Sequence, residues 1–173
     1  MAAPANALAV EVRAVRQSDA APLRALRLRA LADAPDAFAV AADEEATRPD
    51  AEWEALARDS ECAESVVIYA SIAGGRWMGM AAGRWHDRDR GIAHLWGMWV
   101  DPELRRRGVG ERLVDAVRAW ASAQGGGVLR LGVIAAEGDA TPFYEHLGFS
   151  RTGEVAPLRR DPARLVHYLI RPV

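Results

Sequence analysis

The chain alternates between hydrophobic and polar residues from Ala9 to Val15, and this period of two predicts a strand. Three β-rich segments follow Ser65 and read SVVIYASI, GGRWMGMAAGRWH and RGIAHLWGMWV. Turn-forming residues around Gly74 and before Gly91 separate the three segments. The pattern therefore predicts one early strand and, later in the chain, an antiparallel meander of three strands.

Leucines at helical spacing predict a helix between the first strand and the meander. Ser18 or Asp19 can cap its start, and Pro35 ends it. Its apolar stripe consists of Leu23, Leu26 and Leu31. An acidic loop and a second helix follow, and this second helix carries Trp53 and Leu56. The charges of this region are expected to form a solvated face.

Helical spacing returns after the meander and predicts a helix over residues 109–123, which the glycines at 125–127 end. The apolar positions of this helix are Leu113, Val114, Val117, Trp120 and Ala121. A strand reading VLRLGVI follows, then a short helix within DATPFYEHL that Gly148 closes. At least one final strand is expected within LVHYLIRPV.

This order of elements predicts a mixed α/β fold, of the α+β kind, with a single central, mostly antiparallel mixed sheet flanked by helices. The strand–helix–strand unit around residues 109–123 is expected to be parallel and right-handed. Residues 1–8 are expected to be a flexible N-terminus, and residues 9–173 a single domain.

Composition limits the functions that the chain can have. Its net charge is −2 and its pI about 6.1, whereas dedicated nucleic-acid binders take most of their affinity from many basic residues. We therefore expect no nucleic-acid partner. Cys62 is the single cysteine, so no internal disulfide can form, and a buried thiol is expected. No metal site is expected, because metal-ligand spacing is missing around His86, His146 and His167.

The ends of the chain suggest its location and assembly. The first residues, MAAPANALAV, lack the basic leader of a signal peptide, and no apolar run is long enough to cross a bilayer. These features predict a cytoplasmic protein without a membrane partner. The apolar final strand, which carries aromatic residues, would suit a homodimer.

The stretch WVDPELRRRGVGERL points to an anion site. Pro102 ends the preceding strand, and a helix opens directly after RRRGVG, so the first amides of that helix have no internal acceptors. Gly108 and Gly110 lack Cβ atoms and let an anion approach, which favours a di- or polyphosphate. Nucleotide-binding loops do not fit, because no lysine follows Gly110 and Leu113 replaces the third glycine of the dinucleotide motif. A short glycine pair can also be a purely structural turn.

A second motif, FYEHLGF, occupies residues 143–149. With both motifs, the sequence resembles the GCN5-related N-acetyltransferase (GNAT) family. That family's phosphate motif has glutamine or arginine, two variable residues, glycine, one variable residue, and glycine or alanine, which matches Arg105, Gly108 and Gly110. The resemblance covers most of the chain and implies a GNAT-like acyl-CoA N-acyltransferase fold. Glu137 departs from the family, which often has asparagine there, and a carboxylate at this place would disfavour an anionic cofactor.

The resemblance implies acetyl-coenzyme A (acetyl-CoA) as the cosubstrate and no metal. Backbone amides of residues 106–110 would bind its pyrophosphate, with the arginines nearby. The pantetheine arm would lie along the end of the third meander strand, as an added strand would. The implied cofactor-binding residues are Met98, Trp99, Val100, Arg105, Arg106, Arg107, Gly108, Val109, Gly110 and Glu111.

The implied reaction is N-acetyl transfer by direct attack of a neutral amine on the thioester. Tyr144 matches the family's tyrosine and is the candidate catalytic residue that protonates the leaving thiolate, whereas Phe143 is expected in the core. The general base stays open among a water chain, His94, Glu44, Glu45 and Asp87. The acceptor is expected to be a primary amine of a small molecule, peptide or protein. The alternative function is a non-catalytic acetyl-CoA-binding regulatory module.

Overall fold

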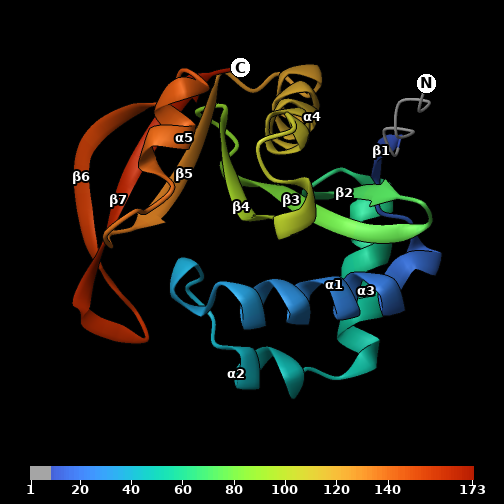
Figure 1. The fold of residues 1–173 in the computed structure, drawn as a ribbon. Coiled ribbons are helices and arrows are strands. Elements are labelled where there is room, and N and C mark those ends of the chain that lie inside the picture. Colours follow the sequence, from blue (N-terminus) through green and yellow to red (C-terminus); the bar gives the residue numbers. More distant parts are fainter. Residues whose placement is uncertain (1–8) are drawn as a thin grey trace, which may run out of the picture.

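Figure 1 shows the computed structural model of the protein, which describes residues 9–173; the expected flexible segment 1–8 lies outside the described residues. A seven-stranded sheet forms the centre, with helices on both faces. The strands are β1 (Val10–Ala14), β2 (Val66–Ala73), β3 (Arg76–Asp87), β4 (Ile92–Val100), β5 (Val128–Ile134), β6 (Ser150–Leu158) and β7 (Asp161–Pro172). The α-helices are α1 (Ala20–Asp33), α2 (Ala42–Ala46), α3 (Asp50–Cys62), α4 (Val109–Ala123) and α5 (Thr141–His146). One-turn 3-10 helices occupy Gln17–Asp19, Pro35–Ala37 and Pro102–Leu104.

The strands lie in the order β1-β2-β3-β4-β5-β7-β6. Neighbouring strands are antiparallel except β4 and β5, which are parallel because α4 connects them as a crossover. The predicted mixed, mostly antiparallel sheet and its central meander are therefore confirmed. The last part of the chain forms two strands, and β7 lies between β5 and the edge strand β6.

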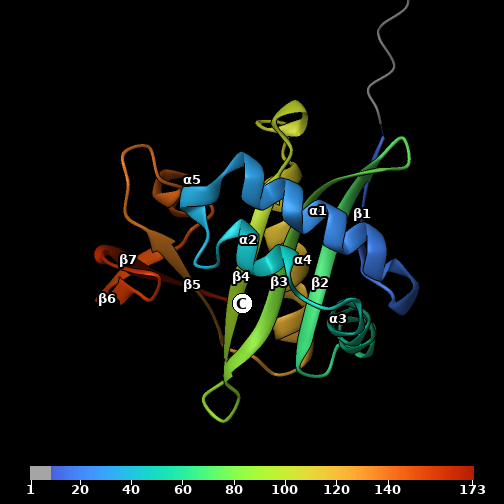
Figure 2. The same cartoon turned by 90° about the horizontal axis from the view of Figure 1, so that it is seen from below.

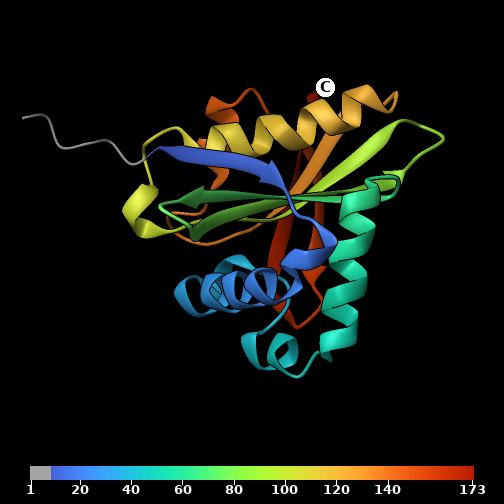
Figure 3. The same ribbon diagram turned by 90° about the vertical axis from the view of Figure 1, so that its right-hand side faces the viewer.

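The two faces of the sheet carry separate hydrophobic clusters, because alternate residues of a strand point to opposite sides. On the α4 face, Leu113, Val117 and Trp120 of α4 are buried against the strands. On the α1 face, helices α1 and α3 bury residues such as Leu23 and Trp53. Figure 3 shows α4 above the sheet and α1, α2 and α3 below it. Figure 2 looks onto the α1 face, where α1 runs across the strands with α2 beside it.

The helix predictions are largely confirmed. Helix α4 spans Val109–Ala123 as predicted, and Gly125, with φ 83°, follows its end. Helix α1 begins after Asp19, whose carboxylate accepts hydrogen bonds from the Arg16 amide and the Arg13 guanidinium, not from a helix amide. Among the helices of residues 9–173, none is long and apolar enough to cross a membrane.

Two expectations are wrong. The acidic segment expected as a loop contains helix α2, and Glu45 within it is buried, not solvated. The reason is that Arg27 and Arg48 both approach its carboxylate to 2.8 Å, which compensates for the loss of water. Cys62, expected to be buried, is exposed because it closes the last turn of α3, beyond the buried residues of that helix.

Gly79 shows how closely β3 packs between its neighbours. A Cβ at this position would lie 2.7 Å from the Oγ of Ser71 and 2.9 Å from the carbonyl oxygen of Trp99. We expect Gly79→Ala to lower the free energy of unfolding by about 1–3 kcal/mol, measured by urea denaturation, because the backbone of β4 must shift. A Cβ on Gly127 would meet nothing within 4 Å, so Gly127→Ala is the matched control. Equal losses in both variants would contradict crowding as the cause.

Candidate active site

Strands β4 and β5 separate partway along their length. They pair only over Ile92 to Leu95 of β4 and Val128 to Leu131 of β5. On its other side, β5 pairs with β7 over its whole length, and Figure 1 shows β4 and β5 diverging toward their C-terminal ends. The backbone of β4 beyond Leu95 therefore lies at an open edge, where an extended ligand can pair with it.

A bulge in β4 lies where this opening begins. The register between β3 and β4 shifts between Met80 and Ala82, so β4 contains one extra residue. Gly97 lies in the bulge with φ 65°, a left-handed conformation that glycine adopts readily. As a result, Trp96 and Trp99 lie on the same face of the sheet, although three positions separate them.

The predicted phosphate loop forms an open niche at the start of α4. After the turn Pro102–Leu104, Arg106 has φ 59° and Gly108 has φ 75°. A Cβ on Gly108 would meet no atom within 4 Å, and the side chains of Arg106 and Arg107 are exposed beside it. The Arg112 amide donates to the Gly108 carbonyl, so the amides before Arg112 have no acceptor within α4. We call this site, residues 105–111, the anion niche, because free amides and the positive helix end favour an anion.

Arg105 makes contacts that hold the niche in place. Its Nε donates to the Val100 carbonyl at 2.9 Å, and its Nη2 pairs with the carboxylate of Asp33 at the end of α1. The indole of Trp99 also donates to Asp33, at 2.9 Å. This hydrogen bond and the Arg105 contact hold the pKa of Asp33 below its ordinary value. The guanidinium of Arg105 thus joins the loop to β4 and α1. Arg105 therefore contributes its backbone to the niche, and its side chain is turned away from it.

The two glycines of the motif have different surroundings. A Cβ on Gly110 would lie 3.0 Å from the Cε of Met98 and 3.1 Å from the ring of Phe143. Gly110 therefore permits close packing of α4 against β4 and α5, whereas Gly108 borders open space. Only Gly108 leaves room for a ligand beside its Cα.

Tyr144 lies on α5 beside the opening. Its neighbour Phe143 lies next to Gly110 together with Met98, which places α5 near the free part of β4. The Tyr144 ring is buried and makes edge-on contacts with Phe143 and Phe149, at centroid distances of 5.1 and 5.7 Å. Burial raises the pKa of Tyr144, so its hydroxyl keeps its proton at neutral pH.

A cavity of about 900 Å³ hollows the α1 face beside the bulge, and we call it the α1-side cavity. Its walls come from α1, α2, α3 and strands β2 to β7. Trp96 and Gly97 belong to its lining, so it reaches the point where β4 and β5 separate. A volume of this size accommodates a small molecule.

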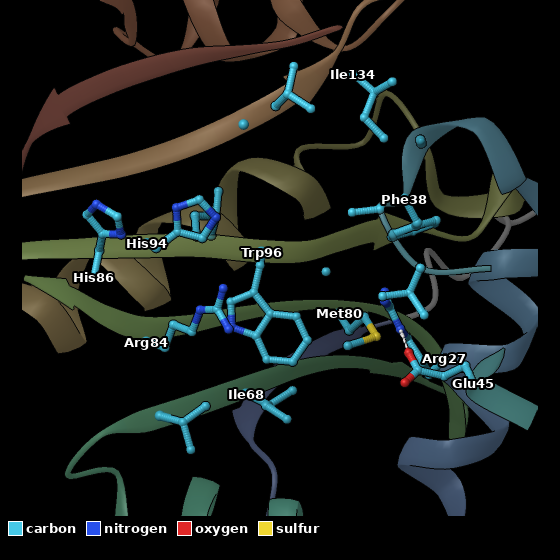
Figure 4. Close-up of a pocket in the computed structure, with 18 of the residues that line it drawn as sticks. Arg27, Phe38, Glu45, Ile68, Met80, Arg84, His86, His94, Trp96 and Ile134 are labelled. Atoms are coloured by element: carbon cyan, nitrogen blue, oxygen red, sulfur yellow. Dashed lines mark hydrogen bonds and ion pairs between the residues drawn. The ribbon is translucent and has the colours of Figure 1, made fainter. Parts of the chain in front are cut away.

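A buried ion pair forms one end of the α1-side cavity, as Figure 4 shows. The Nε of Arg27 donates to Glu45 at 2.8 Å, and the two side chains are 6% and 4% exposed. Arg48 approaches the other oxygen of Glu45 to 2.8 Å, in an ion pair without hydrogen-bond geometry. The Arg27 Nη1 has no hydrogen-bond partner among residues 9–173 and lies 3.7 Å from where a Cβ on Gly97 would be. A cation therefore lies close to the bulge.

Two arginines flank a histidine at the other end of the α1-side cavity. Arg84 of β3 and Arg130 of β5 are both in register with His94 of β4, so the three side chains share one face. Burial, and then the charges of Arg84, Arg130 and His86, lower the pKa of His94 to about 4. His94 is therefore neutral at physiological pH.

A family model described as the acetyltransferase (GNAT) family matches residues 28–149. The chain belongs to the acetyltransferase (GNAT) family. This confirms the expected enzyme class. A search of the curated proteins gives no significant match.

Solved structures support the fold of this acetyltransferase. A GNAT-family acetyltransferase from Streptococcus pneumoniae superposes with a TM-score of 0.79 at 19% identity, over 95% of this chain and 99% of that one. Ard1 from Thermoplasma volcanium gives 0.71 at 22% identity, over 96% and 99%. The protein yncA from Salmonella typhimurium, solved with its cofactor acetyl-CoA, gives 0.73 at 17% identity, over 95% and 94%. The GNAT-like fold is therefore confirmed.

The structure brings most residues predicted for this acetyltransferase to one end of the sheet. Met98, Trp99 and Val100 form the free end of β4, next to the anion niche. The Trp99 side chain packs on the α1 face, so its backbone is what borders the opening. Glu137, which departs from the family pattern, is exposed after β5.

The candidate bases separate into two groups. His94 and Glu45 line the α1-side cavity, whereas Glu44 and Asp87 are outside its lining. Sequence reasoning did not single out the lining arginines of this acetyltransferase. The sequence does mark Arg84 and Arg130 as unusual, since each interrupts a strand of otherwise apolar or small residues. Nothing in the sequence marks Arg27 in this way, because its pairing with Glu45 depends on how α1 packs against α2.

Proposed function

We propose that this acetyltransferase binds acetyl-CoA in the opening between β4 and β5 and transfers the acetyl group directly to a primary amine. The acceptor, a small molecule or a peptide or protein amine, would reach the thioester from the α1-side cavity. The observation that carries the proposal is that the open space beside Gly108 and the free edge of β4 lie at the same end of the sheet.

The anion niche suits the pyrophosphate of the cofactor. Free amides at the start of α4 donate to it, and Arg106 and Arg107 add charge at the rim. The helix dipole contributes about 0.3–1 kcal/mol when such a site is exposed and about 2 kcal/mol when it is partly buried. The free backbone at Met98 to Val100 would hold the pantetheine arm as an added strand.

Bound acetyl-CoA supplies an activated thioester. As the bond between nitrogen and the acyl carbon forms and the carbon–sulfur bond breaks, the nitrogen loses one proton and the sulfur gains one. Tyr144 donates the proton to sulfur, because its α5 lies beside the free part of β4 and its hydroxyl is protonated at neutral pH. A β4 backbone amide near Gly97 can stabilise the charge on the thioester oxygen. His94 is too weak a base for the amine proton, which we assign to solvent.

The last hairpin supports a homodimer, which we also propose. Strand β6 is an edge of the sheet, and exposed apolar side chains lie on β6 and β7. These side chains are Val155, Leu165 and Ile170, which are 45%, 44% and 38% exposed. A second copy would cover them and the free edge of β6.

The anion niche can be tested with a matched pair of glycine variants. Gly108→Ala is expected to weaken acetyl-CoA binding about 10-fold in titration calorimetry, because its Cβ enters the open space of the niche and its backbone is strained. Gly125 also has a positive φ and open space, but lies beyond the other end of α4. Gly125→Ala should therefore retain wild-type affinity. Equal affinity in both variants would contradict the assignment of the niche.

Turnover separates an enzyme from a non-catalytic module that binds the same cofactor. The wild-type protein should release free coenzyme A thiol from acetyl-CoA only when a suitable amine is added. Binding of acetyl-CoA without amine-dependent thiol release, across a broad panel of amines, would favour the non-catalytic module.

A further inference from the structure

Positive charge dominates the α1-side cavity. Its one lining carboxylate, Glu45, is already engaged by Arg27 and Arg48. The arginines of the lining are Arg27, Arg48, Arg84, Arg130 and Arg159. Arg84 and Arg159 are exposed to solvent, so the fold itself does not require a further carboxylate, but the excess of guanidinium groups favours a ligand with a negative charge.

The row formed by Arg84, His94 and Arg130 is the part of the cavity best suited to bind a negatively charged group of a ligand. Arg84 makes no ion pair within residues 9–173. The Arg130 guanidinium stacks on the Tyr168 ring at 3.6 Å, and its side chain is 11% exposed. Its one ion pair is with Glu154 at 2.7 Å, a carboxylate that is 57% exposed and outside the cavity lining. Arg130 is thus held in place with donor groups to spare.

The row places one arginine on each side of His94. Arg84 and Arg130 lie two strands apart, on the order of 10 Å between their backbones, and both side chains line the cavity. The Arg130 guanidinium leans over β7 toward Tyr168 and Glu154, so an anion beside His94 would compete with Glu154 for it. His94 lies between them, and its Nδ1 has no hydrogen-bond partner within residues 9–173. Figure 4 shows Arg84, His94 and Trp96 gathered at one end of the cavity, away from the Arg27–Glu45 pair.

We infer that the acceptor amine carries an anionic group, a carboxylate or a phosphate, which Arg84 and Arg130 bind on either side of His94. This inference rests on the proposed function, because it takes the α1-side cavity as the acceptor site. The acceptor class is therefore amino acids and other small acidic amines, such as aminoalkyl phosphates. Arginine is suited to both anions, since its planar fork donates two parallel hydrogen bonds.

The same charges disfavour other acceptors. A polyamine or another polycation would bring several positive charges against the lining arginines, and like charges in a partly desolvated site repel strongly. An acidic amine has its negative charge compensated by the arginine row.

The test compares binding of matched amines by titration calorimetry. One arm compares the natural amino acids with their carboxamides, a second compares ethanolamine phosphate with ethanolamine, and a third uses spermidine. At least one amine with an anionic group should bind about 10-fold or more tightly than the counterpart that lacks this group, as expected for charge-assisted hydrogen bonds. The first two arms show whether the group is a carboxylate or a phosphate. Equal binding within every pair, or tighter binding of spermidine, would overturn the inference.

Substitutions assign the preference to the row. Arg84→Gln combined with Arg130→Gln should remove the preference for the anionic member of the pair and raise its KM about 10-fold or more, without changing acetyl-CoA affinity. Arg118→Gln is the matched control, since Arg118 lies on α4 and pairs with Asp115 on the opposite face of the sheet. A preference that persists in the double variant would overturn the inference. A wild-type protein that does not bind acetyl-CoA would instead contradict the proposed function. This outcome is distinguishable, because amine binding is measured without the cofactor.

Discussion

Replacing Tyr144 with phenylalanine is expected to lower kcat about 100-fold or more, since a positioned proton donor usually contributes about 10²- to 10⁴-fold. The substitution removes only the hydroxyl, so the edge-on contacts of the ring with Phe143 and Phe149 should persist. Acetyl-CoA affinity should therefore stay close to that of the wild type. Steady-state thiol release and calorimetry measure the two quantities on the same preparation.

Tyr69→Phe is the matched control for this experiment. Tyr69 lies on β2 and is also partly buried, and burial likewise raises its pKa, but it is not at the opening between β4 and β5. The loss of the Tyr69 hydroxyl should leave kcat unchanged. A Tyr144→Phe enzyme with wild-type kcat would exclude the hydroxyl as the proton donor.

The raised pKa of Tyr144 has a consequence for stability at alkaline pH. The folded state keeps the phenol proton at a pH where the unfolded chain, with an ordinary pKa near 10, has lost it. The unfolded state then binds fewer protons, so this group lowers stability as pH rises above about 10. The Tyr144→Phe variant should lack this part of the alkaline loss, which thermal unfolding at pH 8 and pH 11 can measure.

Truncating Glu45 to alanine is expected to lower the free energy of unfolding by about 3–5 kcal/mol, the usual cost of leaving one partner of a buried ion pair alone. The guanidinium of Arg27, only 6% exposed, would lose its carboxylate in a place that water reaches poorly. Chemical denaturation measures this change. Since whole domains are stable by about 5–15 kcal/mol, the variant should be close to unfolding at physiological temperature.

The neighbouring residue provides the control. Glu44 is 58% exposed and only 3.7 Å from the exposed Arg159, so Glu44→Ala should change stability by no more than about 1 kcal/mol. Combining Glu45→Leu with Arg27→Met should recover most of the loss, because apolar replacements leave no buried charge. Equal losses in Glu45→Ala and Glu44→Ala would contradict the role of the buried pair.

The sequence predicts those elements whose pattern is contained in the element itself. Helix α4 has a continuous apolar stripe and glycines after its end, so its bounds follow from residues 109–127 alone. Strand β6 has no such pattern, because it is an edge strand with mostly exposed side chains, a glycine and a proline. Only its pairing with β7 specifies it. Helix α2 is five residues long, too short for a helical period, and depends on the contact between Glu45 and Arg27.

The same distinction applies to the site. The anion niche is formed by seven consecutive residues, 105–111, so its glycines and arginines are visible in the sequence. The α1-side cavity is assembled from residues on three α-helices and six strands, and its charge emerges only when Arg84, His94 and Arg130 come into register. Even within the niche, the sequence cannot show that Arg105 turns to Asp33, because that contact joins residues far apart in the chain.

The bulge at Gly97 sets a requirement on the length of β4 as well as on its composition. If Gly97 were part of a regular pleat, Leu95 and Trp99 would lie on the same side, and the large indole would replace Met98 beneath α4. A regular strand of the same length would thus exchange the inner and outer surfaces of the terminal half of β4. Two compartments that lie back to back are kept in phase because one residue is absorbed in the bulge.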